Sequence, residues 1–354
     1  MARTSAEPPL PGRPTTPNPA RRSDALLAAV RSAGRVVFVS HVNPDPDSLG
    51  SMAGLAHLTR TAFGTPAILT QDGVIGRAEN RSMIETLGLD LVPTAQVQCR
   101  PDDAVVMVDS QPGTGRHTCS FAARPTAVVD HHITPGKLDG VVVVDIRPEL
   151  GACCTMVTEY LTEQRMIPPK ALATALFYGI ETEVSGYPRE ATPADDDALS
   201  HLYPLADHDA LARIRNAPLP VRHLEALSLA LTTAVRCDKL LFAWVNPLRQ
   251  PDQAAEVVDF LIRTEGIQWA ICGGVCGEKV ILSARAAMAN ANAGELLRKV
   301  VGDLGTAGGH HRRAGGAVGI PPGTDLPMLR DELYARIRRE FHLSGPTVPF
   351  LSGV

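Results

Sequence analysis

The sequence predicts an α/β protein in which a doubly wound parallel sheet is followed by a second, smaller α/β domain. Three observations predict this. The chain has 354 residues, which is enough for two domains. Over the first half, short apolar runs alternate with helix-like segments, a pattern typical of a parallel sheet covered by helices on both faces. After about residue 198, that pattern gives way to an irregular helical stretch and then to new strands.

The first half supplies the parallel sheet and its helices. Residues 1–24 are rich in proline and lack apolar periodicity, so we expect a disordered leader there, with order beginning near Ser23. The chain then alternates between the two kinds of element, and Ser48 is expected to cap the second helix. The expected strands are 36–39, 67–69, 104–108, 127–129 and 141–144, and the expected helices are 25–33, 48–61, 80–87, 152–163 and 169–178.

The second half has fewer and less regular signals. We expect a first domain over 25–199, a helical linker over 200–230, a second domain over 231–342 and a loosely held tail over 343–354. The second domain is expected to contain strands at 234–244, 268–275 and 279–284, and helices at 257–264 and 292–300.

Composition and charge exclude several classes of function. Lys and Arg total 34 against 38 Asp and Glu, which excludes a generally basic protein that coats duplex nucleic acid but allows an anionic ligand at one local cationic site. No run approaches the roughly 18 apolar residues of a membrane span, and no apolar signal core begins the chain. We therefore expect no membrane contact and a cytoplasmic location. The seven cysteines lack zinc-ribbon spacing and are expected to be reduced, mostly buried thiols.

Polar side chains follow three of the expected strands, at the point where each strand ends. Each residue alone has an ordinary explanation, such as a helix cap or a turn. Because ligands of open α/β sheets bind beyond the carboxyl ends of the strands, the three sets together indicate a metal site. The residues are His41, Asp45 and Asp47 after the first strand, Asp109 after the third, and Asp130, His131 and His132 after the fourth.

The ligand types suggest which metal would bind. Carboxylates and imidazoles without a thiolate favour Mn²⁺, Mg²⁺, Fe²⁺ or Co²⁺ over a structural zinc, and the imidazoles favour Mn²⁺ over Mg²⁺. There are enough ligands for two ions, and a carboxylate such as Asp109 could bridge them. Two metal ions about 3.5–4 Å apart are the usual apparatus for in-line attack at phosphorus. The cofactors we expect are two divalent ions, first Mn²⁺, with Mg²⁺ or Co²⁺ as alternatives.

These motifs resemble those of a known family. The run from His41 to Ser51, then Asp109, then Asp130-His131-His132, is similar to the DHH phosphoesterase superfamily. The segment 308–316 resembles the glycine-rich signature of the DHH-associated C-terminal domain, and 179–183 resembles the fourth motif. The resemblance covers about residues 25–341 and implies an active site in the cleft between a DHH domain and the smaller domain.

The resemblance also implies a ligand set. It places His41 and Asp45 on one metal, with Asp109 as the bridge. It places Asp47, His131 and Glu183 on the second metal, again with Asp109. The family usually carries Asp where this chain has Glu183, and Glu181 is the rival for that position. The resemblance further implies that His132 contacts the scissile phosphate and helps the leaving group, and that Asp130 orients the histidines.

Substrate-binding residues are expected in both domains. The glycine pair would let the backbone approach a phosphate, and the basic side chains beside it would add donors and positive charge. Surface charge is the alternative for Arg312 and Arg313, and a solvated helix start is the alternative for Arg77. The expected set is Arg285, Gly308, Gly309, His310, Arg312, Arg313, Arg77 and Asn80.

The resemblance is strongest to nanoRNase-like members, which implies a metal-dependent phosphoesterase acting on short RNA or on a small nucleotide such as 3′-phosphoadenosine 5′-phosphate. The alternatives are a cyclic or linear dinucleotide phosphodiesterase, an inorganic pyrophosphatase, and a catalytically weakened nucleotide-binding regulator. Long duplex nucleic acid is not expected as a partner, and the sequence leaves room for a homodimer.

Overall fold

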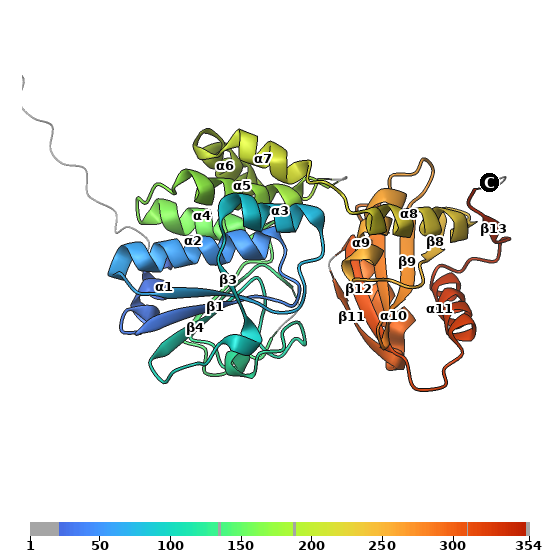
Figure 1. Cartoon of the computed structure of the whole chain (residues 1–354), viewed down its shortest axis with the longest axis horizontal. Helices are drawn as coiled ribbons and strands as arrows, with labels where there is room; N and C mark the ends of the chain where they lie inside the picture. Colours follow the sequence, from blue (N-terminus) through green and yellow to red (C-terminus); the bar gives the residue numbers. More distant parts are fainter. Residues whose placement is uncertain (1–20, 134–135, 187–188, 310, 352–354) are drawn as a thin grey trace, which may run out of the picture.

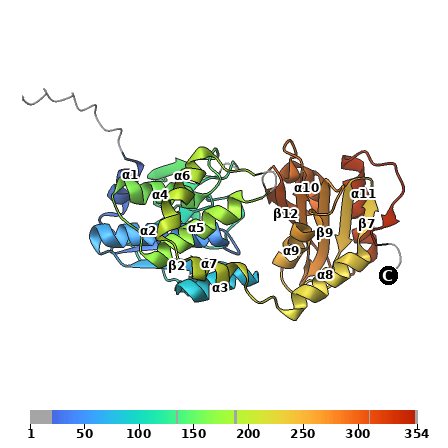
Figure 2. The ribbon, with the colours of Figure 1, turned by 90° about the horizontal axis from the view of Figure 1, so that it is seen from above.

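The computed structural model describes residues 21–133, 136–186, 189–309 and 311–351. These residues form two lobes, each built on its own sheet (Figure 1). The α/β fold class predicted from the sequence is confirmed. The chain passes from the first lobe to the second between α7 (His208–Arg215) and α8 (Val221–Thr233), as Figure 2 shows.

The sheet of the first lobe is parallel and has the strand order β3-β2-β1-β4-β5-β6. Its strands are the short apolar runs of the sequence, and β-branched residues dominate the central ones. The bounds are β1 Arg35–Val39, β2 Ala67–Gln71, β3 Leu91–Pro93, β4 Asp103–Val108, β5 Ala127–Asp130 and β6 Val143–Ile146. The strand order reverses between β1 and β4, and such a switch point is where open α/β sheets bind their ligands.

Helices cover one face of this sheet far more than the other (Figure 1). They are α1 Arg22–Val30, α2 Pro46–Phe63, α3 Ala78–Leu87, α4 Cys153–Glu163, α5 Lys170–Val184, α6 Pro193–Leu202 and α7. The other face is covered by the short 3-10 helix Ser120–Ala123 and by the loops beside it, which pack on apolar side chains such as Val37 and Met107. The helix cover of this second face is therefore thinner than the alternating pattern predicts.

The second lobe contains a mixed sheet with the order β11-β12-β10-β9-β8-β7-β13, in which β8 and β9 are parallel and the other described pairs are antiparallel. Its helices are α8, α9 Asp252–Leu261, α10 Ala293–Val301 and α11 Leu326–Glu340. Its strands are β7 Val235–Cys237, β8 Leu240–Trp244, β9 Trp269–Cys276, β10 Lys279–Ala286, β11 Gly305–Gly309, β12 Arg313–Gly319 and β13 Val348–Pro349.

Several elements differ from the sequence prediction. The expected strand 234–244 is a hairpin of β7 and β8, and the helix expected at 257–264 begins earlier, at Asp252. Strands β11 and β12 of the glycine-rich segment also form a hairpin. The sequence did not predict these strands, because glycine has little strand preference. Within the predicted loose tail, β13 pairs with β7. Helix α1 begins at Arg22, inside the predicted leader.

Packing divides the predicted linker 200–230 between the two lobes. Helix α7 contacts α3 and α5 of the first lobe, whereas α8 contacts β8 and α9 of the second. Each lobe has its own buried apolar cluster, and those of the second lobe lie on the two sides of its sheet. No helix in the described part of the chain is long and apolar enough to cross a membrane.

Candidate metal centre

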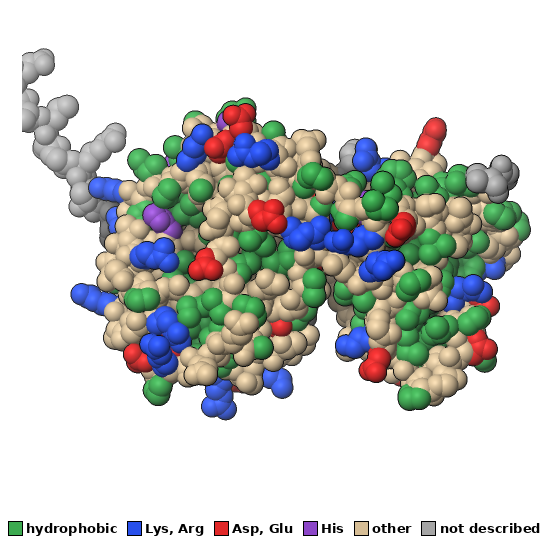
Figure 3. Space-filling view, viewed as in Figure 1, with side chains coloured by type: hydrophobic (Ala, Val, Ile, Leu, Met, Phe, Trp, Pro, Cys, Tyr) green, Lys and Arg blue, Asp and Glu red, His purple; other side chains and the backbone are tan. Residues whose placement is uncertain are grey.

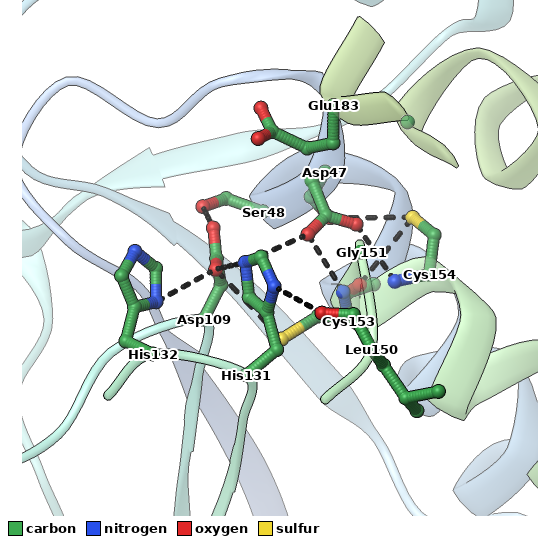
Figure 4. Close-up of polar contacts among 12 residues, drawn as sticks. Asp47, Ser48, Asp109, His131, His132, Leu150, Gly151, Cys153, Cys154 and Glu183 are labelled. Atoms are coloured by element: carbon green, nitrogen blue, oxygen red, sulfur yellow. Dashed lines mark hydrogen bonds and ion pairs between the residues drawn. The ribbon is translucent and has the colours of Figure 1, made fainter. Parts of the chain in front are cut away.

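Three neighbouring strands, β1, β4 and β5, bring the predicted acids and histidines to one edge of the sheet (Figure 4). His41 follows β1, Asp109 follows β4, and His131 follows β5. The backbone of Asp109 is left-handed, with φ of 55°, and its N–H donates to Val129 O at 2.9 Å. Such a conformation costs about 1–3 kcal/mol for a residue other than glycine, and it turns the carboxylate into the site.

The start of helix α2 positions Asp45. Its Oδ1 accepts a hydrogen bond from the Ser48 N–H at 3.0 Å, so Asp45 caps the helix, with Pro46 in the first turn. The prediction that Ser48 is the cap is therefore wrong. The Ser48 hydroxyl instead donates to Asp109 Oδ2 at 2.6 Å, which fixes the orientation of that carboxylate.

Asp47 is buried and held by the start of helix α4. Its Oδ2 and Oδ1 accept hydrogen bonds of 2.7 Å from the N–H groups of Cys153 and Cys154, respectively. Helices α2 and α5 meet closely behind it, because a Cβ on Gly179 would lie 2.5 Å from Cys154 Sγ and 2.9 Å from Pro46 O. Glycine at this position therefore allows the helices to pack closely behind Asp47.

Two histidines present Nε2 to the acids. The Nδ1 atoms of His41 and His131 lie 2.9 Å from Val42 O and 3.2 Å from Leu150 O, and a proton on Nδ1 leaves Nε2 as the coordinating atom. Backbone carbonyls hold metal-ligating histidines in this way. The Nε2 of His41 is buried and makes no hydrogen bond within the described residues.

The acids and histidines form two adjoining ligand groups. In the first, His41 Nε2 lies 3.3 Å from Asp109 Oδ2 and 3.5 Å from Asp45 Oδ2. In the second, His131 Nε2 lies 3.4 Å from Asp109 Oδ1 and 3.8 Å from Asp47 Oδ2, and Cys153 joins this group. Asp109 belongs to both groups through different oxygens. The donor types, and a His41 Nε2 that faces carboxylates without a hydrogen bond to any described residue, fit divalent cations in both positions.

A third arrangement joins Asp130 and His132. His132 Nδ1 lies 2.8 Å from Asp130 Oδ1 and 3.4 Å from Asp109 Oδ1. The Gln111 amide donates to Asp130 Oδ2 at 2.7 Å and to His132 O at 3.1 Å. Asp130 is therefore oriented from one side by Gln111 and in turn orients the imidazole of His132. Gln111 carried no sequence signal, because an amide after a strand is common.

Electrostatics within the cluster are dominated by burial and by Asp109. Burial alone would lower the pKa of His41 and His131, but the nearby carboxylates, Asp109 foremost, outweigh it and raise both pKa values to about 10. Burial would raise the pKa of Asp109, but the same two imidazoles outweigh this and hold its pKa well below the usual range. Burial and the charge of Asp109 raise the pKa of Asp47.

Glu183 stands apart from both ligand groups among the described residues, as Figure 4 shows. It lies on α5, and Arg313 Nη1 of the second lobe is 3.7 Å from its Oε2. Burial raises the pKa of Glu183, although Arg313 opposes this. Glu181, the rival for the fourth motif, forms two hydrogen bonds with Arg215, away from the cluster. The predicted second-metal ligand Glu183 is therefore near the centre but paired elsewhere.

Three of the predicted substrate-binding arginines line a cavity of about 350 Å³ where the two lobes meet. Arg285 Nε donates to Asp259 Oδ1 at 2.6 Å, and Arg312 Nε donates to Glu190 Oε1 at 2.7 Å. The Arg312 Nη1 is buried and without a hydrogen-bond partner in the described part of the chain. Figure 3 shows Lys and Arg side chains gathered at this junction. The lining includes Ser185, Gly186, Glu190, Asp259, Arg285, Arg312 and Arg313.

The remaining predicted substrate residues do not line this cavity. Arg77 crosses to the second lobe, where its Nη2 donates to Asp259 Oδ2 at 2.8 Å. Asn80 is buried in the first turn of α3. Gly308 and Gly309 pair with Gly315 and Ala314 within the hairpin.

His310, the remaining predicted contact, lies outside the described residues. Sequence reasoning missed three groups at the metal centre or the junction. These are the thiol of Cys153, the amide of Gln111 and the carboxylate of Asp259, and no spacing pattern linked any of them to the motifs.

The part of the chain that carries these motifs matches a known protein family. Residues 35–180 match the family described as DHH family, N-terminal domain. An uncharacterized protein from Methanocaldococcus jannaschii is 29% identical over 309 residues, which are 86% of this chain. The chain spans 62% of the length of that relative.

A solved structure shares this fold. An exopolyphosphatase-related protein from Bacteroides fragilis is similar over 90% of this chain and 96% of its own, with a TM-score of 0.72 and 15% identity. A putative family II inorganic pyrophosphatase from Methanococcus jannaschii is more distant, with a TM-score of 0.46 and 14% identity over 84% of this chain and 99% of its own.

Proposed function

We propose, starting from the match of residues 35–180 to the N-terminal domain of the DHH family, that this protein is a metal-dependent phosphoesterase. Its proposed substrates are short oligoribonucleotides or small nucleotides such as 3′-phosphoadenosine 5′-phosphate. The proposed cofactors are two divalent cations, with Mn²⁺ the first candidate for the group of His41, Asp45 and Asp109.

One observation supports the proposal most strongly: Asp109 is shared by two ligand groups that use its separate oxygens. A carboxylate in this position can bridge two cations at the short separation that phosphoryl hydrolysis requires. The cavity between the lobes, with its arginines, offers an anion-binding surface next to the centre, since Arg313 both lines it and faces Glu183.

The chain's own groups would divide the chemical work. When bound, cations in the two groups would supply positive charge beside the phosphate, and a cation with an open position would lower the pKa of a water molecule. His132, oriented by Asp130, is placed beside Asp109 and can hold a proton for the leaving oxygen. Burial and the charge of Arg116 lower the pKa of His132. Arg285, Arg312 and Arg313 would bind further phosphates of the substrate.

A substrate panel tests the proposal. Chelator-treated protein is reloaded with Mn²⁺ and offered dinucleotides, longer oligoribonucleotides, 3′-phosphoadenosine 5′-phosphate, cyclic dinucleotides and pyrophosphate, and the products are separated by chromatography. We expect turnover of the short linear substrates or the small nucleotide. Asp109→Ala, purified identically, is the control for contaminating phosphatases. A folded, metal-loaded sample that hydrolyses no phosphoester would refute the proposal. Turnover of pyrophosphate alone would refute it too and would favour an inorganic pyrophosphatase instead.

A further inference from the structure

The thiol of Cys153 occupies a position in the metal centre that the proposed function does not use. Cys153 is the first residue of α4, directly behind Asp47, and it is fully buried. Its Sγ lies 3.7 Å from Asp109 Oδ1, and Figure 4 shows the sulfur beside Asp109 and His131. The neighbouring Cys154 faces elsewhere, because its Sγ lies 3.3 Å from the Asp47 carbonyl and 3.4 Å from Ser51 Oγ.

The donor atoms of Asp47, Asp109, His131 and Cys153 all lie within 4.8 Å of one another, and three of their distances fit the edges of a tetrahedral site. Ligand bonds to zinc are about 2.0–2.3 Å long, and the edges of a regular tetrahedron are about 1.6 times its bond length, which gives edges of about 3.3–3.8 Å. His131 Nε2 lies 3.4 Å from Asp109 Oδ1 and 3.8 Å from Asp47 Oδ2. With the 3.7 Å from sulfur to Asp109, all three distances fall in that range.

The two ligand groups therefore differ in chemistry. The group of His41, Asp45 and Asp109 offers only nitrogen and oxygen, and it has three protein ligands. The second group offers one sulfur, one nitrogen and two oxygens from four residues. A thiolate ligand shifts preference towards Zn²⁺ and Co²⁺, and four protein ligands fill a tetrahedral shell without an open position.

We propose that Asp47, Asp109, His131 and Cys153 form a closed, thiolate-containing site for Zn²⁺ or its substitute Co²⁺. The adjoining group of His41, Asp45 and Asp109 keeps the open positions and takes the harder ion. In this arrangement Cys153 supplies the fourth ligand, and Glu183 is left to pair with Arg313. The assignment rests on the metal centre of the proposed function but not on its substrate.

Cobalt titration of the full-length, chelator-treated protein tests this assignment. A cobalt–thiolate bond gives a near-ultraviolet charge-transfer band, and tetrahedral cobalt gives intense visible bands. We expect both bands in the wild type, loss of the charge-transfer band in C153A and C153S, and its retention in the matched control C154A. Zn²⁺ should bind C153A roughly 10–100-fold more weakly or worse, since loss of an outer partner alone costs that much. Cobalt bound to the wild type without the charge-transfer band, or an unchanged charge-transfer band in C153A, would overturn the assignment.

A second measurement needs no variant, in case the substitutions disturb folding. X-ray absorption at the zinc edge of the wild-type protein should show one sulfur at about 2.3 Å among oxygen and nitrogen ligands. A shell without sulfur would overturn the assignment. Neither measurement depends on turnover, so a positive cobalt result with an inactive enzyme would refute the proposed function and leave this site standing.

Discussion

The two lobes hold their charged groups in opposite ways. In the first lobe, three carboxylates crowd around His41 and His131, and each imidazole Nε2 lies within 3.8 Å of two of them. In the second lobe, three of the cavity's arginines, Arg285, Arg312 and Arg313, already face a carboxylate. The difference teaches that the acidic centre suits cations, whereas an anion in the cavity would compete with carboxylates for these three arginines. We therefore expect the largest losses from substitutions in the first lobe.

The most severe test of this comparison is Asp109→Asn. Asp109 is shared by both ligand groups, so we expect the loss of both bound cations and a fall in hydrolysis of about 10³-fold or more, equivalent to several kcal/mol of transition-state stabilisation. Metal content by mass spectrometry and initial rates check this. The exposed Asp303→Asn on the second lobe is the matched control. Two bound cations in Asp109→Asn would break the bridging assignment.

Asp130→Asn should have the next largest effect. Its carboxylate orients the imidazole of His132 at 2.8 Å and belongs to neither shared group, so kcat should fall about 10–100-fold while KM changes little. Steady-state kinetics with the best substrate of the panel measure both constants. A rise in KM with kcat intact would show that His132 binds the substrate and takes no part in proton transfer.

Arg285→Ala tests the second lobe. The guanidinium lines the cavity and is already paired with Asp259. We expect it to contribute one charge-assisted hydrogen bond to substrate binding, so KM should rise about tenfold with little change in kcat. The exposed Arg330→Ala on α11 is the control for general loss of positive charge. An unchanged KM in Arg285→Ala would remove the cavity from the substrate-binding surface.

The smallest effect concerns pH and the contact between the lobes. Burial would raise the pKa of Asp259, but Arg285 and Arg77 outweigh it and lower the pKa to about 2. A depressed pKa stabilises the folded state above the ordinary value of 3.8, and that stabilisation is lost as the pH falls towards 2. Thermal unfolding of the wild type should therefore lose more stability below about pH 4 than that of Asp259→Asn. Equal losses in both proteins would contradict this pairing.

The first lobe was predictable from the sequence to a degree that the second was not. Parallel strands buried on both faces are continuous apolar runs, and the chemistry follows their ends, so His41, Asp109 and His131 could be grouped before their positions were known. The hairpin of β11 and β12 is built from glycine and alanine, whose patterns carry no strand period.

Contacts that join distant segments could not be predicted. Cys153 reaches the centre because α4 starts behind Asp47, and the pairing of Glu183 with Arg313 depends on how the two lobes meet. The expected helix ended at residue 178, whereas α5 continues to Val184 and carries Glu183, and the pattern could not show that the partner of Glu183 comes from the other lobe. Packing between elements decides such contacts, and local spacing does not encode it.

Anomalous diffraction from crystals grown with Mn²⁺ and Zn²⁺ tests the central claim most directly. The account predicts two peaks about 3.5–4 Å apart, both within bonding distance of the Asp109 carboxylate. A single peak, or a pair of ions whose shared ligand is a residue other than Asp109, would contradict it.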